Sequence, residues 1–300
     1  MSAGISAITL GSRGSALAMR QTELVAELLR QKLRGVALHI KAVQTAGDRN
    51  QHQPISALGD KGVFVRSIEQ ALLAHEVDIA VHSLKDVPSD VETPGLTLAA
   101  FSPRADARDV LVSRSETDLE ALPAGSRVGT SSLRRRVQLQ AVRPDLEICE
   151  IRGNVDTRLR KLDDGRYEAI ILAAAGMQRL GIADRITQFL PVELFVPDAG
   201  QGIIVLQTRQ DDEAEVLAHA IDDPLSRAAA LAERATVRAL GADCHSPVGA
   251  FAEVKGSRLF VRAMAAREDG SQLVRLQDEG PLTAAEEIGR RLGLCLQSAL

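Results

Sequence analysis

Short β-rich runs alternate with helical patterns along most of this chain, and this alternation limits the folds that it can adopt. The first cycle is a strand at residues 7–12, a helix at 16–33 and a strand at 38–45. Strands that alternate with helices are typical of α/β sheets with crossover connections, so the sequence predicts the α/β class. Further helices are predicted at 63–75, 132–142 and 155–162, and further strands at 78–82, 96–100, 109–113, 127–128, 146–151 and 169–174.

The length of 300 residues indicates two or three domains, each with its own core. We predict a first α/β domain at 1–102 and about 200–221, and a second at 103–199. The reason is a strand-like run at 195–207 that leads out of the second domain, followed by a helical pattern at 212–220. From 222 to 300 a smaller α+β domain is predicted. Its elements are a helix at 225–240, strand-like runs at 251–254, 259–265 and 272–277, and a helix from Thr283.

Composition restricts the classes of partner and compartment. Aromatic residues make up 2% of the chain, with no Trp, so platforms for base stacking are scarce. The first ten residues carry no export pattern and no run approaches a membrane span of about 18 apolar residues, which favours a cytoplasmic protein. Three widely spaced cysteines favour reduced thiols over disulfides. No Cys-x-x-Cys or His-Glu-x-x-His pattern occurs, so no metal site is predicted.

The net charge of −4 conceals a basic segment. Residues 127–161 carry nine Arg and Lys against four acids, a net +5, whereas the rest of the chain is −9. We interpret this segment as a site for a small anion rather than for nucleic acid, which would favour a basic face with stacking residues. A solvated helix face and a nucleic-acid site stay open as alternatives.

Two polar segments stand where a predicted strand gives way to a helix, and open α/β sheets bind ligands at the carboxyl ends of their strands. They are Ser-Arg-Gly-Ser at 12–15 and Thr-Ser-Ser at 130–132, which precedes Arg134 and Arg135. Hydroxyl groups at a helix N-terminus bind anions, and guanidinium groups match carboxylates. Arg152 and Arg158 would extend the same basic wall. No nucleotide-binding glycine motif is present, so a ligand with several carboxylates is favoured, although phosphate would also fit.

Asp86 is the candidate acid or base, because it follows a predicted strand directly after a lysine, in a basic setting that keeps a carboxylate ionised. The alternative is a simple turn residue ahead of Pro88. His82, in the same stretch, is expected to be a packed and hydrogen-bonded residue rather than a ligand.

Cys244 lies in a turn-rich loop at 241–249, so we expect its thiol to be reachable and regard it as the candidate covalent residue. His245 is poorly placed as its base, because neighbouring side chains of an extended segment point in opposite directions. Cys149 and Cys295 are expected to act as small hydrophobic residues.

Eight segments, spread over nearly the whole chain in the same order, resemble the porphobilinogen deaminase family. They are SRGS at 12–15, GDKG at 59–62, HSLKDVP at 82–88, GTSSLRR at 129–135, RGNVDTR at 152–158, AAAGMQRLG at 173–181, GQG at 200–202 and GADC at 241–244. The resemblance implies two domains like periplasmic binding proteins with the active-site cleft between them, and a third domain that carries the cysteine.

The resemblance also implies an activity. The family holds a dipyrromethane cofactor on a cysteine through a thioether, which here would be Cys244, and joins four porphobilinogen molecules head to tail with loss of ammonia. Water then releases hydroxymethylbilane, a precursor in porphyrin and heme biosynthesis. Asp86 would stabilise the electron-poor pyrrole left when ammonia departs.

Each porphobilinogen carries an acetate and a propionate, so the resemblance implies many cationic and hydroxyl contacts. Those assigned to the cofactor are Lys85, Thr130, Ser132, Arg134 and Arg135. Those assigned to the substrate are Arg13, Ser15, Lys61, Arg152, Arg158 and Arg179.

Three departures from the family pattern are present: Ala57 for Lys, Asp156 for Gly, and Ala242-Asp243 for Gly-Gly. Asp243 would disfavour the thiolate of its neighbour. The polar stretch at 45–54 is interpreted either as a lid or as a surface loop. A noncatalytic carboxylate-binding protein of the solute-receptor type is the alternative function, and a monomer is expected.

Overall fold

The structure is a computed structural model that describes residues 5–44, 65–242, 246–267 and 269–300. The chain divides into two compact units. Unit 1 contains Met1–Arg104 and Ile203–Arg227, and unit 2 contains Ala105–Gly202 and Ala228–Leu300. Among the described residues, no helix combines the length and apolar character needed to cross a bilayer.

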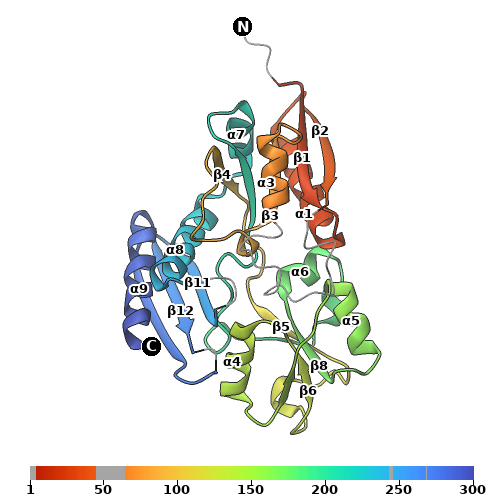
Figure 1. Ribbon diagram of the computed structural model, residues 1–300, viewed down its shortest axis with the longest axis vertical. Helices are drawn as coiled ribbons and strands as arrows, with labels where there is room; N and C mark the ends of the chain where they lie inside the picture. Colours follow the sequence, from red (N-terminus) through yellow and green to blue (C-terminus); the bar gives the residue numbers. More distant parts are fainter. Residues whose placement is uncertain (1–4, 45–64, 243–245, 268) are drawn as a thin grey trace. The chain divides into compact units, whose positions relative to one another are not determined.

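Unit 1 is built on a five-stranded mixed sheet with the order β2-β1-β3-β10-β4 (Figure 1). Strand β1 runs parallel to both β2 and β3, whereas β10 runs antiparallel to β3 and β4. The strands are β1 (Ala7–Arg13), β2 (Ala37–Val43), β3 (Ile79–Ser83), β4 (Leu96–Phe101) and β10 (Ile204–Arg209). The helices are α1 (Ala16–Lys32), α3 (Arg66–Leu73) and α7 (Glu213–Ala218), with 3₁₀ turns η2 (Leu84–Asp86) and η5 (His219–Ile221).

Helix α1 packs on this sheet because its apolar residues recur at helical spacing. Val25, Ala26 and Leu29 are fully buried against Ile8 and Leu10 of β1. The helix begins where the Ser15 hydroxyl accepts a hydrogen bond from the amide of Ala18, a typical N-cap. This packing places the start of α1 beside the carboxyl end of β1.

Unit 2 contains a second five-stranded mixed sheet, with the order β7-β6-β8-β5-β9. Strand β6 runs parallel to β7 and β8, and β5 runs antiparallel to β8 and β9. The strands are β5 (Asp109–Ser113), β6 (Arg127–Gly129), β7 (Glu147–Cys149), β8 (Ala169–Ala173) and β9 (Gln188–Phe189). The helices are α4 (Leu133–Val142), α5 (Val155–Asp163) and α6 (Ala174–Arg179), with η3 (Leu119–Ala121) and η4 (Ala183–Arg185).

Unit 2 also contains a three-stranded antiparallel sheet, β11-β12-β13, with helices packed on one face (Figure 1). The strands are β11 (Val248–Lys255), β12 (Arg258–Ala265) and β13 (Val274–Pro281). The helices are α8 (Pro224–Leu240) and α9 (Ala285–Ala299), the latter preceded by η6 (Leu282–Ala284).

A buried carboxylate ties this small sheet to the segment before β10. Glu233 of α8 is fully buried, and its two oxygens accept hydrogen bonds from the amides of Gly200 and Ala252, each at 2.7 Å. A carboxylate that accepts two amide bonds is well satisfied in the interior. Glu233 therefore connects α8, β11 and the 200–202 segment.

The prediction of an α/β chain with a smaller α+β part is confirmed, and the predicted elements lie close to those observed. The prediction of one strand over 195–207 is wrong in its first half, since only Ile204–Arg209 is a strand. Phe195 and Val196 are buried but belong to no strand. Their apolar side chains gave this part of the sequence its strand-like pattern. Strand β10 then returns the chain to the first sheet. The predicted three-domain boundaries stay a prediction.

Two short elements were missed by the sequence analysis. Helix α6 consists largely of small residues, so it has no amphipathic period, and β9 is a pair of residues at the sheet edge. The interpretation of Cys295 as a hydrophobic residue is wrong, because it is exposed on α9. Cys149 is only half-buried, at the outer strand of its sheet.

The close crossing of α8 and α9 should depend on two glycines. A Cβ at Gly289 would lie 2.0 Å from the carbonyl oxygen of Ala232, and one at Gly293 would lie 2.5 Å from that of Thr236. We therefore expect Gly289→Ala to lower the free energy of unfolding by about 1–3 kcal/mol in urea denaturation. Gly14→Ala is the matched control, since its methyl group meets open space. Equal stability of the two variants would contradict this account of the helix pair.

Candidate functional site

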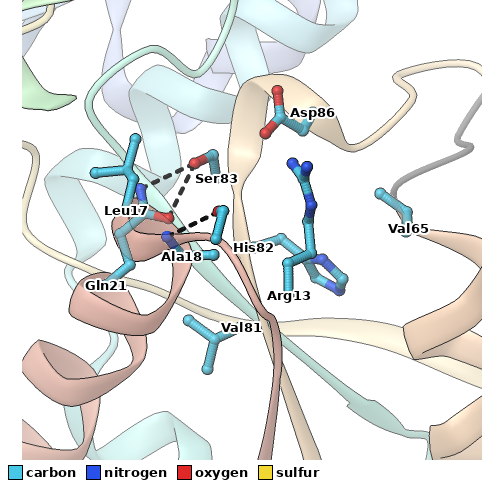
Figure 2. Close-up of a pocket in the computed structure, with 10 residues that line it drawn as sticks. Arg13, Leu17, Ala18, Gln21, Val65, Val81, His82, Ser83 and Asp86 are labelled. Carbon is cyan, nitrogen blue, oxygen red and sulfur yellow. Dashed lines mark hydrogen bonds between the residues drawn. The ribbon is translucent and has the colours of Figure 1, made fainter. Parts of the chain in front are cut away.

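Six polar side chains of unit 1 line a small pocket of about 50 Å³ (Figure 2). One of them is Gln21 of α1. Arg13 ends β1, Ser15 caps α1, His82 and Ser83 end β3, and Asp86 lies in η2. Because β1 and β3 are neighbouring parallel strands, their carboxyl ends meet at one edge of the sheet. The topology therefore brings together residues that are about 70 positions apart.

This pocket holds one cationic and one anionic side chain among hydroxyl groups. Figure 2 shows the Arg13 guanidinium and the Asp86 carboxylate turned toward one another. The side-chain amide of Gln21 donates a hydrogen bond of 2.9 Å to the Ser83 hydroxyl, which orients that group. Asp86 is exposed and Lys85 is half-buried in the same turn. Such a pocket can bind a carboxylate at the guanidinium and present a carboxylate to a developing positive charge.

The prediction that His82 is packed and hydrogen-bonded is confirmed. It is buried, and its Nε2 lies 3.1 Å from Oε1 of Gln207 on β10. Burial lowers the pKa of His82 to about 4, and the positive charge of Arg13 acts in the same direction.

In unit 2, hydroxyl groups of residues just before α4 accept hydrogen bonds from main-chain amides at the start of this helix. The Ser132 hydroxyl caps the helix by accepting a hydrogen bond from the Arg135 amide at 3.4 Å. The Thr130 hydroxyl is buried and accepts one from the Ser132 amide at 3.2 Å. The N-terminus of α4 thus keeps the partial positive charge that favours binding of an anion.

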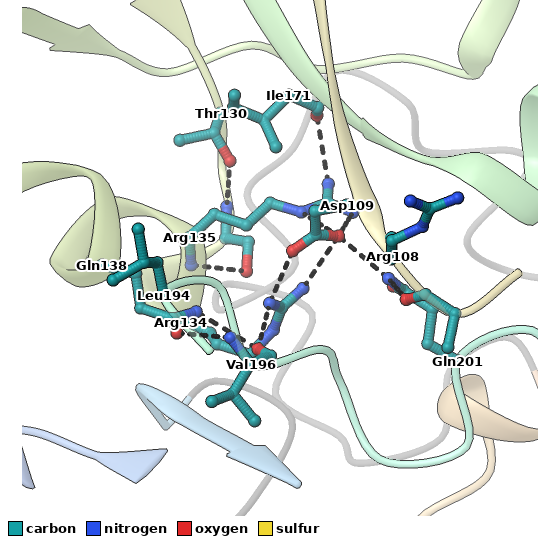
Figure 3. A network of polar contacts seen from close by, with 12 residues as sticks. Arg108, Asp109, Thr130, Arg134, Arg135, Gln138, Ile171, Leu194, Val196 and Gln201 are labelled. Atoms are coloured by element: carbon teal, nitrogen blue, oxygen red, sulfur yellow. Dashed lines mark hydrogen bonds and ion pairs between the residues drawn. The ribbon is translucent and has the colours of Figure 1, made fainter. Parts of the chain in front are cut away.

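Asp109, at the start of β5, lies between the two arginines that follow this cap (Figure 3). Its Oδ2 is 2.7 Å from Nη1 of Arg134, and its Oδ1 is 2.8 Å from Nη2 of Arg135. All three side chains are buried. Burial opposes ionisation of Asp109, but the two guanidinium groups outweigh it and hold the pKa of this carboxyl far below its usual range.

Each arginine of this triad also donates to a main-chain oxygen of the same unit. Arg134 donates to the carbonyl oxygen of Val196 at 2.7 Å, and Arg135 donates to that of Ile171 at 3.1 Å. The Gln201 amide also donates to Asp109, at 2.9 Å. The triad of two cations and one anion keeps a net positive charge in a fixed position.

Arg158 and Arg179 contrast with this triad, because among the described residues neither forms an ion pair with a carboxylate. Arg158 donates to the Gly153 carbonyl oxygen at 2.7 Å, and Arg179 donates to that of Gly202 at 2.6 Å. Burial lowers the pKa of Arg158 to about 10, with the positive charges of Arg135 and Arg152 adding to the effect. Burial alone lowers the pKa of Arg179 to about 10. An anionic ligand would stabilise both cations.

Arg152 is placed differently, since it forms an ion pair with Glu150 on the segment that follows β7. Its positive charge, like that of Arg135, still contributes to the lowered pKa of Arg158.

Two predicted site residues, Lys61 and Cys244, lie outside the described residues, as do Ala57, Asp243, His245 and the 45–54 stretch. The other predicted residues form two groups, one in each unit. Three residues of these sites were not predicted from the sequence: Asp109 as the counterion of Arg134 and Arg135, Gln201 as a donor to Asp109, and Ser83 in the pocket. A lone acid at the start of a strand carries no sequence signal, because its partners are 25 and 26 residues away. The described residues contain no cluster of three or more potential metal ligands.

Comparison with known families matches most of the chain. The family model described as "Porphobilinogen deaminase, dipyromethane cofactor binding domain" matches residues 8–217, and that described as "Porphobilinogen deaminase, C-terminal domain" matches residues 228–297. A porphobilinogen deaminase from Roseiflexus sp. (strain RS-1) is 45% identical over 98% of this chain and 95% of the relative. One from Syntrophus aciditrophicus is 43% identical over 94% of this chain and 92% of the relative.

Similar solved structures include solute-binding proteins. The crystal structure of a methionine-binding protein covers 72% of this chain and 90% of its own, with 14% identity and a TM-score of 0.45. A periplasmic sulfonate-binding protein from Methylobacillus flagellatus covers 76% of this chain and 68% of its own, with 12% identity and a TM-score of 0.41.

Replacing Asp109 by Asn should leave two buried guanidinium groups without a counterion. We expect a loss of about 3–5 kcal/mol in the free energy of unfolding at pH 7, measured by urea denaturation. The depressed pKa of Asp109 stabilises the fold above the ordinary Asp pKa of about 3.9, and this contribution is lost as the pH falls toward the lowered value. The difference between the two proteins should therefore shrink below about pH 4.

Asp106→Asn is the control for this prediction, because Asp106 pairs with the more exposed Arg108. It should cost less than about 1 kcal/mol. A similar loss in both variants would show that the Asp109 triad contributes no more than a surface pair.

Proposed function

Because the chain belongs to the porphobilinogen deaminase family, we propose that its two groups of cationic and hydroxyl side chains hold the carboxylates of the pyrroles on which it acts. The chain is a transferase of tetrapyrrole biosynthesis that joins four porphobilinogen molecules head to tail, with loss of ammonia, to give hydroxymethylbilane. It carries a dipyrromethane cofactor. The family membership decides against the alternative of a noncatalytic carboxylate-binding protein.

The observation that carries the proposal is the pair of half-buried side chains of Arg158 and Arg179. Each has a lowered pKa and, among the described residues, no carboxylate partner. A ligand carboxylate would supply the missing negative charge, and its planar geometry fits a guanidinium. We propose that these two arginines and Arg152 bind substrate carboxylates in unit 2.

The donors around α4 suit the cofactor, which also carries carboxylates. We propose that Thr130, Ser132 and Arg135 bind the cofactor carboxylates at the helix N-terminus. Arg134 is proposed to add its positive charge from its buried position. Lys85 of unit 1 is also proposed to bind the cofactor. When bound, the dipyrromethane supplies the pyrrole carbon to which the first substrate is joined. Its attachment to Cys244 is a proposal from the family pattern.

Asp86 is proposed as the catalytic carboxylate of the unit 1 pocket. Departure of ammonia leaves positive charge on the substrate pyrrole, and an adjacent carboxylate stabilises that charge and accepts the pyrrole proton. Arg13 and Ser15, in the same pocket, are proposed to bind a substrate carboxylate. The same role is proposed for Lys61. The cytoplasmic location, the monomeric state and the absence of nucleic-acid and membrane partners stay predictions.

The proposed attachment is tested by the intact mass of the purified protein, which should exceed the sequence mass by two pyrrole units. Cys244→Ser should remove both the excess mass and the activity. Cys149→Ser and Cys295→Ser are the controls and should retain both, because one thiol is half-buried beside Glu147 and the other is exposed on α9. An adduct retained by Cys244→Ser would overturn the attachment.

Asp86→Asn removes the charge of the proposed catalytic carboxylate while keeping its shape. We expect kcat to fall by roughly 10²–10⁴-fold with the fold intact, measured by product formation and thermal melting. Asp90→Asn is the control, since Asp90 is an exposed acid outside the pocket. Near-normal turnover of Asp86→Asn would rule out this role.

A further inference from the structure

A chain of hydrogen bonds leads from the unit 1 pocket into the interior behind it. His82 lines the pocket, and its Nε2 lies 3.1 Å from Oε1 of Gln207. The side-chain amide of Gln207 in turn donates to Oε1 of Glu69 on α3 at 2.8 Å. The second Glu69 oxygen accepts a hydrogen bond from the Thr93 hydroxyl at 2.9 Å. His82 and Gln207 are both buried.

The hydrogen-bonding capacity of these groups allows only one arrangement of donors and acceptors along this chain of bonds. An ionised carboxylate has only acceptors, so the Gln207 group facing Glu69 is the amide nitrogen. The Gln207 oxygen then faces His82, and only a protonated Nε2 can donate to it. In a neutral imidazole the other nitrogen, Nδ1, is consequently without a proton.

We propose that His82 is a positioning residue whose Nε2 proton is held toward Gln207 by Glu69 while burial keeps the ring neutral, so that the pocket keeps Arg13 as its cation and Asp86 as its anion. This inference rests on the proposed role of the pocket in substrate binding. Imidazolium formation at this position would place a second positive charge near Arg13 and offer Asp86 a competing partner.

The charged groups around His82 agree with this assignment. Arg13 of β1 and Asp86 of η2 line the same pocket, and Glu69 of α3 acts through Gln207. The other lining residues are apolar or uncharged. The lowered pKa of His82 is consistent with an imidazole that stays neutral across the physiological range. Figure 2 shows its ring beside the Arg13 side chain.

The first test reads the tautomer directly in the purified holoenzyme. ¹⁵N NMR of labelled histidines should show His82 with a protonated Nε2 and an unprotonated Nδ1, with no titration between pH 5.5 and 8. Loss of the signal in His82→Gln assigns it. A signal for protonated Nδ1, or titration near the ordinary His pKa of about 6.5, would overturn the proposal.

The second test exchanges the hydrogen-bond donor and acceptor at positions 69 and 207 without changing the net charge of the network. In the double variant Glu69→Gln/Gln207→Glu, the residue 69 amide can donate to a carboxylate at 207, which then lies beside His82 and raises its pKa. If that pKa returns to about 6.5, kcat/KM should fall about fourfold between pH 8 and pH 6 relative to the control. Glu69→Gln alone is the matched control, because its oxygen can still accept from Gln207 and its amide can donate to Thr93.

The two readouts separate this inference from the function proposed above. If NMR shows the expected tautomer but the pH profile of the double variant is identical to that of Glu69→Gln, the positioning role of His82 is overturned. The roles proposed for Asp86 and Arg13 are not affected by that outcome. Failure of the proposed pocket would appear instead as normal turnover in Asp86→Asn. Should the double variant not fold, as judged by thermal melting, the NMR result on the unmodified holoenzyme alone decides.

Discussion

The buried ion triad of Asp109, Arg134 and Arg135 is the interaction on which the organisation of unit 2 depends. Two guanidinium groups can occupy the interior because one carboxylate pairs with both, and each arginine also donates to a main-chain oxygen of another segment. The triad therefore joins the start of β5 to the first turn of α4. It also leaves an excess positive charge behind a helix N-terminus, where an anion is favoured.

The two groups of site residues have different electrostatic character. In the unit 1 pocket, one cation and one anion stand beside a buried imidazole and two serine hydroxyl groups. In unit 2, buried or half-buried arginines outnumber their carboxylate partners, and burial together with its cationic neighbours lowers the pKa of Arg158. The first arrangement suits stabilisation of a developing charge, and the second suits retention of a ligand with many carboxylates.

Much of the fold was predictable from local patterns, because the helices and strands that pack on a sheet carry apolar residues at the spacing of that packing. Helix α1 and strand β1 are examples. The pattern failed where burial came without regular structure, as at Phe195 and Val196, and where a helix lacked an apolar stripe, as in α6. Cys295 shows the reverse failure, since an apolar side chain on an amphipathic helix need not face the core.

The sequence by itself determined the class of fold, the family and the types of side chain available to bind carboxylates, because these properties reside in local runs of residues. Only the tertiary structure decided what each charged group faces. Asp109 meets two arginines more than 20 residues away, and His82 meets an amide held by a glutamate on another element. Charge state and hydrogen-bond polarity depend on distances of a few ångströms, which are set when distant segments pack together and not by the order of residues along the chain.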